Sequence, residues 1–162
     1  MAKNATSMIV NKFTKITKLV NTLTEQYIYA GVPSDKDSRI DESEVNNAIL
    51  AYINDRGSPA NNIPARPFME PGIELAKDKI NAQLKKAGQY ALDGKKSEME
   101  QAFHRAGLIA QNSIRSVINA GIRPELAPGT LAARRRAGKT RTKPLIDTGQ
   151  LRNSIIYAVR RK

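Results

Sequence analysis

The sequence predicts an α+β fold, in which a small antiparallel sheet packs against a long antiparallel helical hairpin and an N-terminal helix. Two long stretches of helical periodicity meet at a tight Asp-Gly turn, and β-rich segments lie near both ends of the chain. A long extended C-terminal arm completes the prediction. At 162 residues the chain suits one domain, 1–162, with a helix and sheet body at 5–121, a basic arm at 122–147 and a closing turn and strand at 148–162.

Composition limits the classes of protein that fit. Apolar residues make up 40% of the chain, enough for one core, but aromatic residues only 5%, so we expect an aliphatic core. We expect no membrane span, since no run of eighteen apolar residues is present. The absence of cysteine excludes disulfides and thiolate metal sites, which fits a reducing cytoplasm.

The N-terminal region predicts a helix followed by a strand. Between residues 5 and 25, apolar side chains recur at alternating spacings of four and three, with Lys and Thr between them, which is typical of an amphipathic helix. These residues are Ile9, Phe13, Ile16, Val20 and Leu23. The β-rich segment 27–33 then predicts a strand, and a similar segment at 154–160 is its natural partner.

A short helix and an extended segment are predicted next. The polar loop 34–43 lacks the ligand pattern of a calcium loop, and the helix after it is expected to be capped by Asp41 or Ser43 and to end at Gly57. Three prolines then predict that 63–72 is extended rather than helical.

Within this extended segment, Phe68 and Met69 are expected to plug the core. Arg66 has no obvious partner nearby in the sequence.

The helical hairpin is the strongest prediction. Apolar periodicity starts at Gly72 and continues to a stop at Gly94. Ser97 and Glu100 have the spacing of a capping box, which predicts the start of a second helix that ends at Gly121. Two helices of about twenty residues joined by so short a turn must run antiparallel.

The arm that follows is strongly basic and broken by proline. Residues 123–162 hold eleven Lys or Arg and only two acids, so they carry +9 of the chain's net charge of +12. Pro124 and Pro128 are expected to break regular structure, 131–136 to form one helical turn, and Thr148 to cap a short turn before the last strand.

The densest basic cluster is the candidate functional site. It comprises Arg134, Arg135, Arg136, Lys139, Arg141 and Lys143. One interpretation is that these cations line a channel and contact DNA phosphates without reading bases. The alternatives are a solvated basic loop, or arginines that bind carboxylates of an adjacent subunit.

No catalytic, metal or cofactor site is predicted. His104, the only histidine, lies in the middle of a predicted helix, and nothing nearby in the sequence supplies the rest of a catalytic triad. The carboxylates are scattered along helix faces, with no pair that can be placed about a common cleft. We therefore expect a protein that is not an enzyme.

Two motifs, with the hairpin between them, carry a resemblance to a known family. They are the segment IPARPF at 63–68 and the run from LAP at 126–128 through ARRR to KPLIDTGQLRNSI at 143–155. In this combination the chain resembles the neck and tail-completion proteins of tailed bacteriophages, which include putative tail components and virion-morphogenesis proteins. Together with the hairpin, these motifs span most of residues 27–160.

The resemblance implies a structural virion protein that forms a ring in the neck, joins head to tail and surrounds the DNA channel, in a head–tail joining or a tail-terminator role. It implies a hexamer, or a dodecamer nearer the portal, and neighbours of the head-closure, tail-tube or tail-terminator kind. An assembly role for one set of motif residues belongs to this expectation. The set is Arg66, Pro67, Phe68, Asp147, Thr148, Gly149, Leu151 and Ser154.

The rival hypothesis is a small basic nucleic-acid-binding protein of the cytoplasm. A chain with a pI near 10.1 attracts polyanions whatever its biological role, so charge alone does not separate the two. The rival predicts salt-dependent DNA binding by a monomer or dimer, with no ring.

Overall fold

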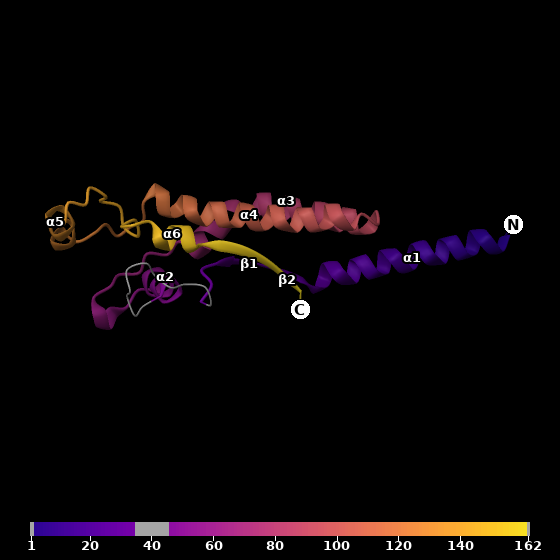
Figure 1. Cartoon of the computed structure of the whole chain (residues 1–162), viewed down its shortest axis with the longest axis horizontal. Helices are drawn as coiled ribbons and strands as arrows, with labels where there is room; N and C mark the ends of the chain where they lie inside the picture. The colour runs from indigo at the N-terminus through magenta and orange to yellow at the C-terminus, as the bar shows by residue number, and fades with distance from the viewer. Residues whose placement is uncertain (1, 35–45, 162) are drawn as a thin grey trace. The chain divides into compact units, whose positions relative to one another are not determined.

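The computed structural model describes residues 2–34 and 46–161, and its secondary structure is mostly helical with a two-stranded antiparallel sheet (Figure 1). The α+β prediction is confirmed. The elements, in chain order, are α1 (Ala2–Glu25), β1 (Gln26–Gly31), α2 (Asn47–Arg56), the 3-10 turn η1 (Pro59–Asn61), α3 (Met69–Leu92), α4 (Lys96–Ala120), α5 (Pro128–Arg136), α6 (Gln150–Ser154) and β2 (Ile156–Arg161).

The chain forms two compact units, each with its own apolar core. Unit 1 contains the described residues of Met1–Tyr29, Lys77–Ile109 and Ala158–Lys162. Unit 2 contains those of Ala30–Ala76 and Ala110–Tyr157, and therefore the whole basic arm.

The core of unit 1 is built where α1 packs on the α3 and α4 segments. Small residues let the helices approach, and Met99 and Phe103 fill the remaining space. Its buried members are Leu19, Ala87, Ala91, Met99, Ala102 and Phe103. Ile28 of β1 and Val159 of β2 pack against this cluster, while Tyr27 and Tyr29 are exposed, as alternation along a strand requires.

The core of unit 2 is larger and aliphatic apart from one ring. Phe68, Ile114, Ile118 and Ile155 have no exposed surface, which confirms that Phe68 plugs the core. Gly72 allows close packing here, because a Cβ at this position would lie 2.6 Å from the Ile114 Cα.

The helical hairpin prediction is confirmed, including its turn. Lys95 N–H donates to the Tyr90 carbonyl at 2.8 Å and Gly94 N–H to that of Ala91 at 3.1 Å. Gly94 has φ +75°, so the end of α3 is a Schellman motif that reverses the chain into α4.

The predicted start of α3 was wrong by three residues. The helix begins at Met69, so Pro71 lies in its first turn. Backbone N–H groups in the first turn have no carbonyl partner within the helix, so the N–H that proline lacks costs no helical hydrogen bond there. The Asp55 carboxylate of α2 accepts hydrogen bonds from the N–H groups of Phe68 at 2.8 Å and Met69 at 3.1 Å. A residue thirteen positions away in the sequence thus caps this helix.

Two other predicted caps were also wrong. The cap of α2 is Asn46, whose side-chain oxygen accepts from Ile49 N–H at 2.8 Å, while Asp41 and Ser43 lie outside the described residues, as does most of the loop 34–43. Ser97 lies inside α4, which begins at Lys96, so no capping box forms. The predicted stop at Gly57 is confirmed.

No helix in the described part of the chain is long and apolar enough to cross a membrane.

Candidate functional site

The basic arm contains a longer helix than predicted. Pro128, expected to break the structure, occupies the start of α5, where its fixed φ favours a helix. The helix runs for nine residues instead of one turn, and Arg134, Arg135 and Arg136 form its last turn. Lys139 N–H donates to the Arg134 carbonyl at 2.9 Å, and Gly138 has φ +70°, so a glycine turn ends the helix.

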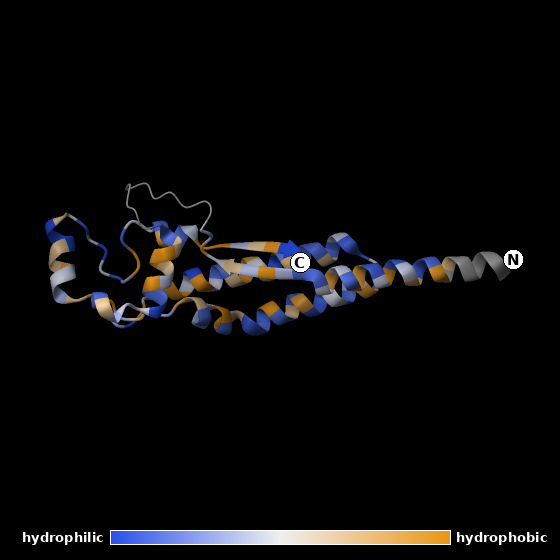
Figure 2. Ribbon diagram, turned by 90° about the horizontal axis from the view of Figure 1, so that it is seen from below, coloured by the Kyte–Doolittle hydropathy of each residue, from blue (hydrophilic) through white to orange (hydrophobic). Residues whose placement is uncertain are grey.

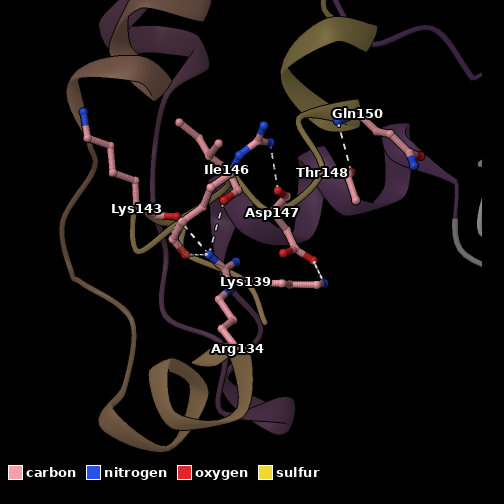
Figure 3. A network of polar contacts seen from close by, with 8 residues as sticks. Arg134, Lys139, Lys143, Ile146, Asp147, Thr148 and Gln150 are labelled. Atoms are coloured by element: carbon pink, nitrogen blue, oxygen red, sulfur yellow. Dashed lines mark hydrogen bonds and ion pairs between the residues drawn. The ribbon is translucent and has the colours of Figure 1, made fainter. Parts of the chain in front are cut away.

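Arg134 is the centre of the folded arm. One guanidinium nitrogen, Nη1, donates to the carbonyl oxygens of Arg141 at 3.0 Å, Lys143 at 3.3 Å and Ile146 at 3.2 Å. Figure 3 shows the side chain reaching from α5 toward the turn that these carbonyls form. The charge of Arg134 therefore binds the arm's own backbone.

Asp147 fixes the next part of the arm through two cations. Its carboxylate forms an ion pair with Lys139 Nζ at 2.6 Å, and its carbonyl accepts from Arg141 Nη1 at 3.0 Å (Figure 3). The hydrogen bond from Lys139 lowers the pKa of the Asp147 carboxyl, and the nearby charges of Arg134 and Arg141 act in the same direction. The other carboxylate oxygen, Oδ1, is buried and accepts no hydrogen bond from the described residues.

Lys143 connects the arm to the end of α4. Its Nζ donates to the carbonyl of Asn119 at 2.6 Å, one of the four carbonyls that a helix leaves without an internal partner at its C-terminus. A cation at this position also opposes the negative end of the helix dipole. Arg152 binds the side chain of the same Asn119, Nη1 to Oδ1, at 3.1 Å.

Arg135 and Arg136 differ from the rest of the cluster. Both side chains are exposed, and neither side chain forms a hydrogen bond or ion pair with the described residues. The six predicted cations therefore separate into four that hold the arm together and two, adjacent on the last turn of α5, that are available to a partner.

Arg66 of the first motif has a partner after all, far away in the sequence. It is 7% exposed, and its Nε and Nη2 donate to the carbonyls of Pro124 at 2.7 Å and Glu125 at 3.0 Å. It thus joins the segment before α3 to the start of the basic arm. Pro67, beside it, is exposed.

The other motif residues contribute to local structure. Leu151 is buried in the same cluster as Phe68. Thr148 Oγ1 accepts from Gln150 N–H at 3.3 Å and so supports the short turn, but the N-cap position of α6 is occupied by Gly149, not by Thr148. Ser154 Oγ donates to the Leu151 carbonyl at 2.8 Å. Gly149 has φ +89°, a conformation that favours glycine just before α6.

Two contributors to this architecture were not predicted. Besides Asp55, Arg115 of α4 donates through Nη2 to the carbonyls of Asn153 at 3.0 Å and Ile155 at 2.7 Å, and so anchors the end of α6. The position of Arg115 among the apolar residues of a predicted helix indicated a structural role. Its partners could not be predicted, because they are backbone carbonyls and no sequence pattern identifies them.

An open pocket of about 200 Å³ lies beside the arm in unit 2. Polar side chains that already bind backbone groups or each other line it, among them Arg66, Arg134 and Asp147. Among the described residues, no group of three or more His, Cys, Asp or Glu side chains is placed to hold a metal ion.

Comparison with known proteins gives no match to a family model, to a curated protein or to a solved structure.

Proposed function

We propose that this chain is a structural protein of a tailed-phage virion, and that copies of it form a ring in the neck that joins head to tail around the DNA channel. The two sequence motifs support the proposal by their resemblance to neck and tail-completion proteins. A hexamer, or a dodecamer nearer the portal, follows from the same resemblance. Before assembly the chain would reside in the host cytoplasm.

The observation that carries the proposal is the pair of unpartnered arginines on α5. Arg135 and Arg136 are exposed at the end of a helix that Arg134 fixes to the turn after it. Two neighbouring cations on a fixed support suit contact with a repeating anion such as the DNA backbone, which needs neither base readout nor a shaped pocket. In a ring, each copy would add the same pair to the channel.

The motif residues support the proposal in a second way. Arg66 and Asp147 both bind the arm, Arg66 through its guanidinium and Asp147 through its ion pair with Lys139. Their role in assembly would thus be indirect, because they position α5 for its partner. A chain that uses its motifs to hold a basic helix suits a structural role better than a catalytic one.

The test is the joining of heads to tails in particles that lack the chain. Supplying the wild-type chain should restore joined, infectious particles, whereas R135E/R136E should leave heads and tails separate. K85E/K86E is the matched control, because Lys85 and Lys86 of α3 are also adjacent and exposed. Normal joining by R135E/R136E, or joined particles without any copy of the chain, would contradict the proposal.

The second candidate is a small basic nucleic-acid-binding protein of the cytoplasm, favoured by the same two arginines and the net charge of +12. It predicts that a monomer or dimer binds DNA and that particles without the chain are normally joined. The joining experiment therefore separates the two functions.

A further inference from the structure

A recess opens beside the last turn of α5, within unit 2. Its volume of about 370 Å³ falls in the range of about 300–1,000 Å³ that is usual for small-ligand pockets. We call it the arm recess, because α5 and the loop after it form the lining. Figure 2 shows that this loop is mainly hydrophilic. The charged and hydroxyl-bearing lining residues are Arg134, Arg135, Lys139, Thr140, Arg141 and Thr142.

The arm recess carries a net positive charge. All the ionisable residues in its lining are cations, and among them Lys139 alone is paired with a carboxylate of the described residues, that of Asp147 at 2.6 Å. Arg134 and Arg141 donate to backbone carbonyls. Because a carbonyl is neutral, both keep their full positive charge beside that of Arg135. The recess therefore attracts an anion.

The loop after α5 adds neutral hydrogen-bond donors to this charge. Thr140 and Thr142 are exposed, and neither hydroxyl forms a hydrogen bond with the described residues. The backbone N–H groups of 140–142 donate to no described residue either. Polar groups without a partner in the protein bind water or a ligand. An anion with several oxygen atoms would find both charged and neutral donors here.

Contacts within the arm fix the walls of the recess before any ligand binds. Arg134 Nη1 donates to three carbonyls of the loop, while Lys139 and Arg141 hold Asp147 at the other end of it (Figure 3). A site whose shape is already fixed loses less conformational entropy on binding. The cations that hold the arm together thus build the recess, and Arg135 is the cation in its lining that remains free to bind.

We propose that the arm recess binds one phosphate group, through the Arg135 guanidinium and the hydroxyls of Thr140 and Thr142. A phosphate presents its negative charge on more oxygen atoms than a carboxylate does, so it suits several donors of both kinds. Arg136 does not line the recess, so the two exposed arginines have different roles. The inference rests on the proposed function and adds a formed phosphate site to it.

The first experiment measures binding of a labelled DNA duplex to the full-length chain by fluorescence anisotropy, over a series of salt concentrations. T140V/T142V removes both hydroxyls at constant charge, so we expect affinity to fall about tenfold with an unchanged salt slope. R135Q should also lower the slope of log affinity against log salt, by about 0.9. T130V is the control, since Thr130 is exposed on α5 but does not line the recess.

The second experiment adds inorganic phosphate to the full-length chain and records backbone amide shifts by NMR. We expect saturable shifts of the amides of 140–142, and we expect R135Q to abolish them. A loss of DNA affinity in T140V/T142V assigns the recess to a phosphate of the DNA backbone, whether or not free phosphate binds alone. Saturable shifts without that loss assign it to a free phosphate.

The recess and the proposed function fail in different ways. If T140V/T142V binds DNA like the wild type and inorganic phosphate causes no saturable shift, the phosphate site is wrong. The proposed function then stands as long as R135E/R136E still blocks the joining of heads to tails. Joined particles without the chain overturn the proposed function, whatever the recess binds. Circular dichroism checks that every variant is folded.

Discussion

The helical pair α3–α4 and the segment that follows it, 122–155, are held by different forces. The helices pack through small and apolar side chains, such as Ala87, Met99 and Ala102. The segment 122–155 has apolar anchors as well, but cations that donate to backbone carbonyls determine its path, with Arg134 alone serving three of them. The helical pair is stabilised by burial of apolar surface. In the segment 122–155, cationic side chains donate hydrogen bonds to the segment's own backbone carbonyls.

This difference shows that counting basic residues overestimates the number of cations that are available to bind a partner. Lys139 and Lys143 look equivalent to Arg135 and Arg136 in the sequence, yet the first two bind Asp147 and the Asn119 carbonyl. Hydrogen bonds to charged groups contribute about 1.5–3 kcal/mol each, so breaking them to bind an external anion offsets part of the binding free energy. The three predictions below test this division, from the largest expected effect to the smallest.

The buried apolar contacts of the α3–α4 pair predict the largest loss of stability. Ile114 of α4 is completely buried and contacts the position of Gly72, so I114A should leave a cavity that the packed helices cannot close. We expect the free energy of unfolding to fall by about 2–5 kcal/mol, measured by urea denaturation. L108A on the same helix, where the side chain is 45% exposed, is the control, and an equal loss there would contradict the packing described.

The hydrogen bonds of Arg134 predict a smaller loss of stability, confined to the basic arm. R134K keeps the charge but removes the planar group that reaches three carbonyls, so we expect local stability over 137–147 to fall by about 1.5–3 kcal/mol. Hydrogen exchange should show faster exchange there, with little change in α3. R135K should change neither region, and protection retained in R134K would show that the arm does not depend on this guanidinium.

The ion pair of Lys139 with Asp147 predicts the smallest effect, and one that depends on pH. The lowered pKa of Asp147 means that its carboxylate stabilises the folded state above its usual value of 3.8, and that this contribution is lost as pH falls through the folded pKa. The stability advantage of the wild type over D147N, read from urea denaturation, should be small near about pH 6 and shrink further as the pH is lowered.

The control for this prediction is E125Q, because the Glu125 side chain is exposed and forms no ion pair with the described residues. An advantage over D147N that grows on acidification would contradict the lowered pKa of Asp147. Equal behaviour of D147N and E125Q would show that the pair does not hold the arm.

The same contrast explains what could be predicted from the sequence. The hairpin was predictable because apolar residues repeat with the helical period and Gly94 marks the turn, and both signals are local. The pairing of β1 with β2 was predictable from β-branched and aromatic composition. Burial of Phe68 followed from an apolar residue between prolines.

The architecture of the candidate site was not predictable, because its contacts join residues distant in sequence through backbone groups. Arg66 binds carbonyls 58 and 59 residues away, and Asp55 caps a helix that it does not belong to. The sequence identified the basic cluster, but the separation of Arg135 and Arg136 from Arg134 depends on which way each side chain leaves α5. The direction in which each side chain leaves α5 is known only from the folded structure.

The most direct test of this division is the salt dependence of DNA binding by the full-length chain. Removing one cation that binds a DNA phosphate should reduce the slope of log affinity against log salt concentration by about 0.9. We predict that R135Q/R136Q lowers the slope by about 1.8 per chain relative to the wild type, whereas K139Q/K143Q leaves it nearly unchanged. An equal reduction in both variants, or a reduction only in K139Q/K143Q, would contradict the account.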